Sequence, residues 1–135
     1  MSAASNYLEN KLLDHTLGGT AFTQPSSLYL GLFTNDSGNA VTNLEAGTLT
    51  DEISGGSYAR ETVAFSAASS GSASTSATVT FTAATANWGT ITHVAVLDAS
   101  SAGNVLFWGA VTTSKTIESG DTFQISSGNL TISLA

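Results

Sequence analysis

The feature of this chain that most constrains its fold is a series of short apolar runs separated by turn-forming residues. Residues 27–33, SLYLGLF, place three leucines on one face of an extended chain and Tyr29, Gly31 and Phe33 on the other. Similar runs recur about every dozen residues, at 57–65, 77–83, 90–97, 105–112, 122–125 and 130–134. Gly- and Ser-rich turns separate them. The pattern predicts a mainly β fold, either an antiparallel β-sandwich or a jelly roll.

One stretch near the start departs from the strand pattern and predicts a helix. Apolar residues recur at helical spacing over about residues 6–17, and Gly18 and Gly19 follow them. Asn6 and Glu9 have the arrangement of a capping box at the start of this stretch. We expect one N-terminal helix that covers an end of the β core, with docking onto a neighbouring subunit as the alternative.

Two segments lack firm periodicity. Residues 34–53 are long for a structureless loop, so we expect a short strand or a partner contact within them. Their oxygen-rich start, NDSGN at 35–39, is compatible with a bound cation or with an Asx-type turn. Residues 66–76 consist almost entirely of Ala, Ser and Gly, which predicts a flexible surface loop.

Charged residues are scarce, at 10% of the chain, against about 25% in an ordinary soluble domain. We therefore expect a surface that is largely covered by neighbouring proteins. A length of 135 residues predicts one β-rich domain over 1–135. The net charge is −7 and the only cations besides His are Lys11, Arg60 and Lys115, so no basic stripe favours nucleic-acid binding.

The chain has no cysteine, which excludes disulfides and thiolate metal sites. No run approaches the roughly 18 apolar residues of a membrane span, and the N-terminus lacks the pattern of a signal peptide. We expect no membrane contact and assembly in the cytoplasm.

Few residues suit catalysis or metal binding. The candidate bases are His15, beside Asp14, and His93, within a predicted strand. Two isolated histidines do not make a zinc site. Asp51 and Glu52 are adjacent and expected to be solvated, which does not fit the separated carboxylates of a glycosidase. We expect a non-enzymatic protein with no metal and no cofactor.

The aromatic residues favour core packing. Trp88 lies just before a predicted strand, and Trp108 lies within another beside Gly109, where a bulge or a close backbone approach is possible. The alternative is that Tyr58, Trp88 and Trp108 form a surface on which sugars stack.

Three segments combine aromatic residues with glycines: SGGSYAR at 54–60, TANWGTITHVAVLDA at 85–99 and LFWGAVTTSKTI at 106–117. With them, nearly the whole chain resembles a family of small tailed-bacteriophage virion proteins that are often labelled tail fibre-like. The resemblance implies a β-rich particle component, found in the virion and assembled in the host cytoplasm, and it transfers no catalytic residue.

A compact sandwich without a repetitive shaft favours a capsid cement or decoration protein that bridges capsid subunits, with a tail-fibre or tail-tip component for host attachment as the alternative. The expected partners are the major capsid protein or tail proteins, and further copies of the chain in a homo-oligomer, with a trimer as one option. The expected contact residues are Ser2, Asn6, Asp51, Glu52 and Arg60.

Overall fold

The computed structural model describes residues 2–134. Its elements, in chain order, are β1 (Ser2–Ala4), α1 (Asn6–Thr16), β2 (Tyr29–Phe33), α2 (Ala40–Ala46), β3 (Glu61–Thr62), β4 (Ser72–Ser74), β5 (Val79–Thr80), β6 (Gly89–Leu97), β7 (Val105–Ile117), β8 (Gln124–Ile125) and β9 (Thr131–Ser133). No helix among the described residues is long and apolar enough to cross a membrane. The predicted mainly β, antiparallel fold is confirmed.

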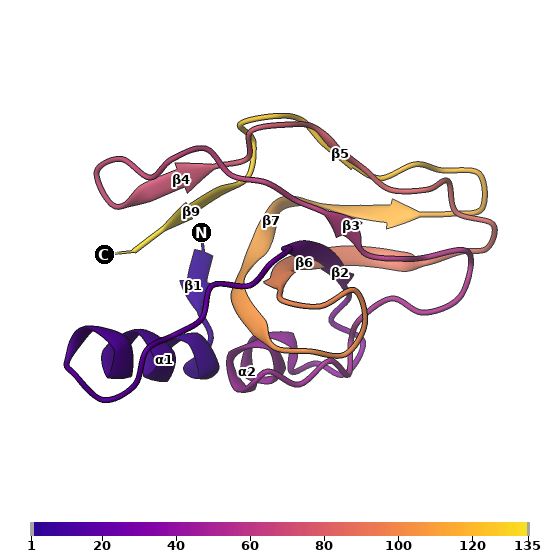
Figure 1. Ribbon diagram of the computed structural model, residues 1–135. Helices are drawn as coiled ribbons and strands as arrows, with labels where there is room; N and C mark the ends of the chain where they lie inside the picture. Colours follow the sequence, from indigo (N-terminus) through magenta and orange to yellow (C-terminus); the bar gives the residue numbers. More distant parts are fainter. Residues whose placement is uncertain (1, 135) are drawn as a thin grey trace.

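A five-stranded antiparallel sheet forms the middle of the molecule, in the order β1-β7-β6-β2-β3 (Figure 1). In its centre, Leu30 pairs with Val96 and Leu32 with Val94. Both faces of these strands are buried, which explains their nearly continuous apolar sequences.

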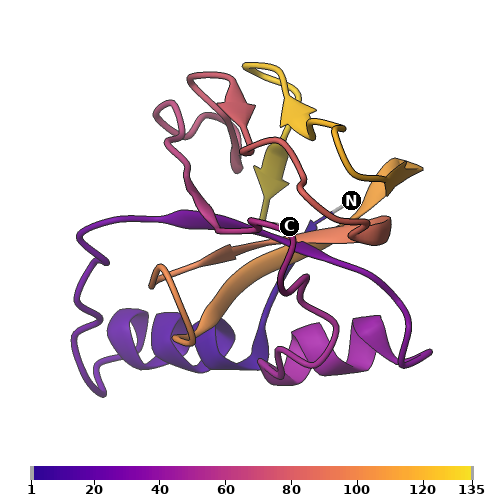
Figure 2. The same ribbon diagram turned by 90° about the vertical axis from the view of Figure 1, so that its right-hand side faces the viewer.

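Two short strand pairs, β4-β9 and β5-β8, form one discontinuous ribbon over this sheet. The register is almost constant along the ribbon, from Ala73–Ile132 to Val79–Ile125. The Phe81 N–H continues it by donating to the Phe123 carbonyl at 2.9 Å. Figure 2 shows three layers, with the ribbon on one side of the sheet and both helices on the other.

The sheet has a separate apolar cluster on each face. Between sheet and ribbon, Leu30, Leu32 and Val96 pack with Phe81 and Phe123 and their neighbours. On the helix side, the cluster consists of Phe33, Leu44, Ala95, Leu97 and Val105. The ribbon and α2 therefore each supply the apolar cover for one face.

The N-terminal helix is confirmed, but its predicted capping box is wrong. The N-cap is Ser5, whose Oγ accepts from the Leu8 N–H at 3.3 Å and donates to the Val105 carbonyl. Asn6 is the first helical residue and Glu9 is exposed. The helix starts at Ser5 because this fully buried side chain also binds the sheet.

The structure corrects both segments that lacked periodicity. Residues 34–53 contain the helix α2, which the sequence did not predict; α2 ends at Gly47, whose φ of 79° suits glycine. In place of the expected short strand, the end of this segment forms a single antiparallel bridge between Glu52 and Phe33 of β2. Within residues 66–76, β4 pairs with β9, so part of the expected loop is a strand. This strand was missed because its small polar residues show no apolar alternation.

Candidate functional site

Arg60 lies in a buried ion pair and not on an exposed contact surface. Its Nε and Nη2 donate to the two carboxylate oxygens of Glu52, both at 2.7 Å. Its Nη1 donates to the carbonyls of Ala99 and Ala102 at 2.7 and 2.8 Å. The exposed fractions of the two side chains are 2% for Arg60 and 15% for Glu52. Arg60 therefore joins the segment before β3 to the turn that follows β6.

Tyr58 completes this network. Its hydroxyl donates to Glu52 Oε2 at 2.9 Å and accepts from the Leu32 N–H at 3.0 Å. Burial and the negative charge of Glu52 raise the pKa of Tyr58. Burial alone would lower the pKa of Arg60, but hydrogen bonding and Coulomb attraction to Glu52 outweigh it and raise this pKa. The prediction that Glu52 is solvated is wrong, because it is the common acceptor of this network.

Asp51 is also buried, at 7% exposure, and the prediction of a solvated side chain is wrong here too. Its carboxylate accepts from Ser37 N–H at 3.0 Å and from Ser37 Oγ at 2.6 Å, while its carbonyl accepts from the Thr34 N–H. Asn35 Oδ1 accepts from the Ala40 N–H, five residues further along the chain, so this contact is not an Asx-type turn. Asp51 thus joins the two ends of residues 34–53. Among the described residues, no group of three or more His, Asp or Glu could hold a metal ion.

The three aromatic residues do not gather on one surface. Trp88 is 6% exposed, and its Nε1 donates to the Gly56 carbonyl at 2.9 Å. Tyr58 meets the Trp88 ring edge-on at a centroid distance of 5.5 Å. Trp108 packs against the cluster on the opposite face of the sheet, where its Nε1 donates to Glu45. Core packing is confirmed, and the predicted sugar-stacking surface is not formed.

Each histidine makes a local hydrogen bond. His15 Nδ1 accepts from the Phe22 N–H at 3.0 Å, after the end of α1. His93 in β6 is 8% exposed and contacts Thr92 Oγ1 through Nδ1 at 2.8 Å. Burial lowers the pKa of His93, and the charge of Asp51 opposes this shift. Both imidazoles thus contribute to local structure.

The N-terminal contact candidates lie near the surface. Ser2 is in β1, a strand that the sequence did not predict, and its Oγ accepts from the Ser133 N–H at 3.1 Å. Asn6 is exposed at the start of α1. Of the five expected contact residues, Asn6 is therefore exposed and Ser2 half-buried, whereas Asp51 and Arg60 are buried and Glu52 is mostly covered.

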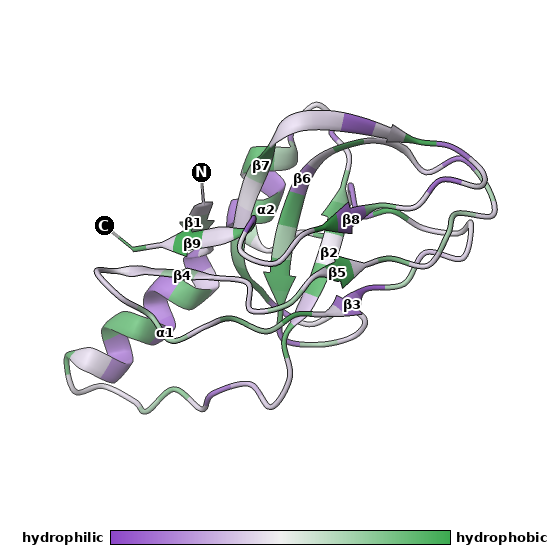
Figure 3. Ribbon diagram, turned by 90° about the horizontal axis from the view of Figure 1, so that it is seen from above, coloured by the Kyte–Doolittle hydropathy of each residue, from purple (hydrophilic) through white to green (hydrophobic). Residues whose placement is uncertain are grey.

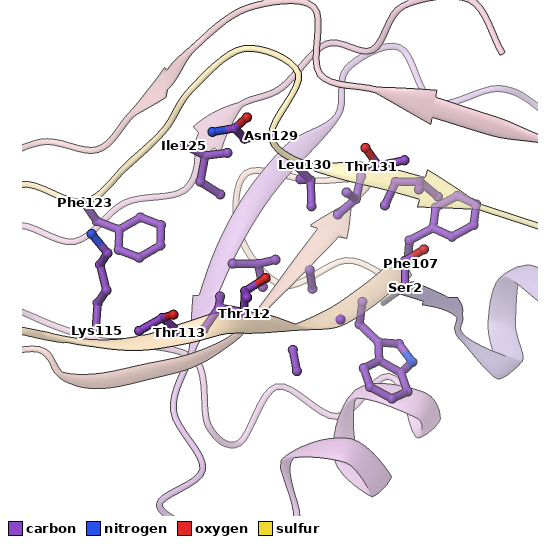
Figure 4. A pocket seen from close by; sticks show the side chains of 18 of the residues that line it. Ser2, Phe107, Thr112, Thr113, Lys115, Phe123, Ile125, Asn129, Leu130 and Thr131 are labelled. Atoms are coloured by element: carbon purple, nitrogen blue, oxygen red, sulfur yellow. The ribbon is translucent and has the colours of Figure 1, made fainter. Parts of the chain in front are cut away.

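A groove of about 580 Å³ opens between β7 and the C-terminal half of the ribbon. Figure 4 shows Phe123, Ile125 and Leu130 on one side of it, facing Thr112 and Thr113 on β7. None of the residues that line the groove is acidic, and one is basic, Lys115. Sequence reasoning missed this groove; its one local signal is the uncharged stretch VTTS that precedes Lys115.

A second groove, of about 420 Å³, is lined mainly by apolar residues of α1, the segment that follows it, β7 and the ribbon. Leu13, Leu17 and Leu134 are 55%, 80% and 55% exposed. Figure 3 shows apolar turns of α1 close to the end of β9. Apolar side chains therefore remain exposed around this helix.

A sequence model of the family described as Podophage GP4 fiber I protein gp80 matches residues 3–133. A comparison with curated proteins gives no match. The match covers both helices and nearly all of the strands described above, and it agrees with the resemblance to tail fibre-like virion proteins. The chain belongs to this family of bacteriophage fibre proteins and is therefore a component of the phage virion.

Proposed function

We propose that this chain is a non-enzymatic structural subunit of a phage tail fibre and works through contacts with other virion proteins. The observation that carries this proposal is the match to a fibre-protein family over residues 3–133. It favours the fibre over capsid cement, the first expectation from the sequence.

The surface supports a role in assembly. Arg60 is buried against Glu52 and therefore contributes little positive charge to the exposed surface. Leu13, Leu17 and Leu134 expose more than half of their side chains. Leu134 also lines the second groove, whose lining is mainly apolar. Exposed apolar side chains and an apolar groove on a sparsely charged protein are typical of an interaction surface.

A non-enzymatic role is supported by the structural contacts of the side chains that could act as catalytic acids or bases. Asp51 holds a loop, Glu52 holds Arg60, and His15 and His93 make local hydrogen bonds. Each of these side chains therefore makes at least one hydrogen bond that stabilises the local structure. The proposed partners are other tail proteins. If the chain lies at the tip of the fibre, the same assignment gives it a role in host attachment.

Capsid cement is the second candidate function. The observation in its favour is the layered arrangement of sheet, ribbon and helices, without a repetitive shaft among the described residues (Figure 2). Cementing would join this protein to two or more capsid subunits, and many modest contacts over a shell would add up through multivalency.

Location and copy number in purified virions separate the two functions. The experiment is immunogold electron microscopy with an antibody to the chain, combined with quantitative mass spectrometry against the major capsid protein. Tail labelling at low copy number supports the fibre. Head labelling at a copy number comparable with the capsid protein overturns it in favour of cement, and absence from washed virions overturns both.

A further inference from the structure

The connection between α1 and β2 is weakly held. Residues 17–28 contain no helix or strand, and none of them is buried. The hydrogen bonds of its first half all run back to α1, from the N–H groups of Leu17, Gly19, Thr20 and Phe22. Within residues 2–134, no hydrogen bond joins residues 23–27 to the sheet or the ribbon. Figure 1 shows α1 at one side of the molecule, with the connection running back from it to β2. Residues 2–22 therefore form one unit, the N-terminal unit, and residues 23–27 are its hinge.

The N-terminal unit is attached to the sheet mainly through β1. This edge strand pairs with β7 alone among the described strands. Ser5 continues the attachment, because its N–H donates to the Leu106 carbonyl at 2.9 Å and its Oγ donates to the Val105 carbonyl. Leu8 is the one buried residue of α1. Detaching the unit would thus break a short ladder of hydrogen bonds and leave the edge of β7 open.

The second groove, of about 420 Å³, separates the rest of the unit from the body of the fold. Leu12 and Phe22 of the unit line it together with Ile132 and Leu134 of the ribbon end. A gap of this kind removes the packing contacts that would hold α1 in place. Segments with little buried apolar surface open locally at a lower free energy than the core. We therefore expect the unit to detach more readily than the central strands.

We propose that the N-terminal unit exchanges between two copies of the chain, so that β1 of each copy pairs with β7 of the other. The fold itself identifies the occupant of the vacated site, because the unit of a second copy has the same sequence as the unit that fills this site within one copy. The β1–β7 ladder and the contact of Ser5 with Val105 re-form between the chains. Reciprocal exchange gives a closed dimer with two-fold symmetry.

The hinge and the exposed leucines favour the exchanged dimer. Pro25 restricts Gln24 to extended conformations, which suit a hinge that runs from one copy to the other. Leu13 and Leu17 of the unit are 55% and 80% exposed in the single copy. In the exchanged dimer, the body of the second copy lies beside the unit and provides a surface to cover them. The dimer thereby gains apolar burial that the monomer lacks.

The exchange goes beyond the fibre assignment and does not depend on it. In a particle, copies that are held close together have a high effective concentration, which favours exchange over closure within one copy. Two copies joined in this way separate only when a unit detaches. The contact is therefore slow to dissociate even where the buried area is modest.

Cross-linking between two different variants tests the exchange, because the chain has no cysteine of its own. Ser2 of the unit lies beside Ser133 of β9, with its Oγ 3.1 Å from the Ser133 nitrogen. Ser2→Cys and Ser133→Cys chains are mixed, held at about 200 µM below Tm and then diluted to about 2 µM. They are treated with a short bis-maleimide, which does not need disulfide geometry.

We expect cross-linked dimers of one Ser2→Cys chain with one Ser133→Cys chain, at least about ten-fold above the yield with Thr62→Cys in place of Ser133→Cys. Thr62 is exposed in β3, at the opposite edge of the sheet. Size-exclusion chromatography with light scattering of the natural sequence should show a monomer and a dimer that interconvert slowly.

Ser5→Ala separates exchange from an ordinary interface. It removes the same contacts from the monomer and from the exchanged dimer, so the dimer fraction at equilibrium should change less than about two-fold. The rate of interconversion should rise about ten-fold, because these contacts break when the unit detaches. A change in the dimer fraction with an unchanged rate would contradict exchange.

Three results overturn the proposal: a monomer after incubation at every concentration, a dimer in which Ser2→Cys and Ser133→Cys chains are not linked, and a ladder of larger species in place of a closed dimer. None of them bears on the fibre assignment, which is tested by location and copy number in the virion.

Discussion

Removing the Arg60 guanidinium disrupts the most connected polar group of the structure. We predict that Arg60→Ala lowers the free energy of unfolding by about 3 kcal/mol. Four hydrogen bonds are lost, two to Glu52 and one each to Ala99 and Ala102. Alanine adds no new contact, so the loss of unfolding free energy measures how strongly this network stabilises the attachment of the turn after β6.

The magnitude follows from what remains behind. Deleting one partner of a buried ion pair costs about 3–5 kcal/mol, because the other charge stays buried without compensation. Glu52 keeps the hydrogen bond from Tyr58 and 15% exposure to water, so the lower end of this range applies. At about 2.1 cal/mol/K per residue, the 135 residues have an unfolding entropy near 0.28 kcal/mol/K, and Tm should fall by about 10 °C.

Urea and thermal unfolding followed by circular dichroism measure this loss. Lys11→Ala is the control, because Lys11 makes only a cation–π contact with Tyr7 at 5.7 Å, and it should cost less than about 1 kcal/mol. Combining Arg60→Met with Glu52→Gln removes both charges and should be more stable than Arg60→Ala alone. The reasoning is refuted if Arg60→Ala unfolds within about 1 kcal/mol of the natural sequence, or if the double substitution is the less stable of the two.

Three further perturbations test other parts of the structure. Burial lowers the pKa of His93 below its ordinary 6.5, so as the pH falls the imidazole takes up a proton in the unfolded chain before it does so in the folded chain. The free energy of unfolding should therefore decrease as the pH drops from about 6.5 towards the folded-state pKa, by at most ~1.4 kcal/mol per pH unit. Urea unfolding at several pH values should show this slope reduced in His93→Phe, and an identical slope would contradict the assignment. Ser5→Ala removes the N-cap acceptor of α1 and the donor to Val105 and should lower the unfolding free energy by about 1–3 kcal/mol in urea titrations, whereas a neutral effect would mean that Ser5 does not cap α1 in solution. Gly31→Ala places a Cβ 3.0 Å from Leu97 Cδ1 and 3.2 Å from Glu52 Oε2, so Tm should fall in thermal melts by the equivalent of about 1–3 kcal/mol, and an unchanged Tm would mean that the site relaxes freely.

Local patterns were sufficient for the elements that form the centre of the fold. The apolar runs at 27–33 and 90–97 correspond to β2 and β6, because strands buried on both faces need apolar side chains at nearly every position. The run at 105–112 marks the start of β7, which continues to Ile117 through mostly exposed residues. Helical spacing likewise located α1 to within one residue at its C-terminal end. These features depend on residues close in sequence, so the sequence alone determines them.

Local patterns failed where a structure depends on distant partners. β4 forms because Ala73 pairs with Ile132, and Ser5 replaces Asn6 as the cap because it also binds Val105. Neither partner is visible in the short sequence around these residues. Small polar segments are strands or loops according to what lies beside them.

The candidate site shows the same division. From the sequence alone, it was determined that positive charge is scarce and that the chain has the motifs of a phage fibre family. Only the tertiary structure decided that Arg60 and Asp51 are buried and that a groove lies between β7 and the ribbon. The physical reason is that burial and strand pairing are properties of surfaces, which the chain creates only when β6, β7 and the ribbon come together.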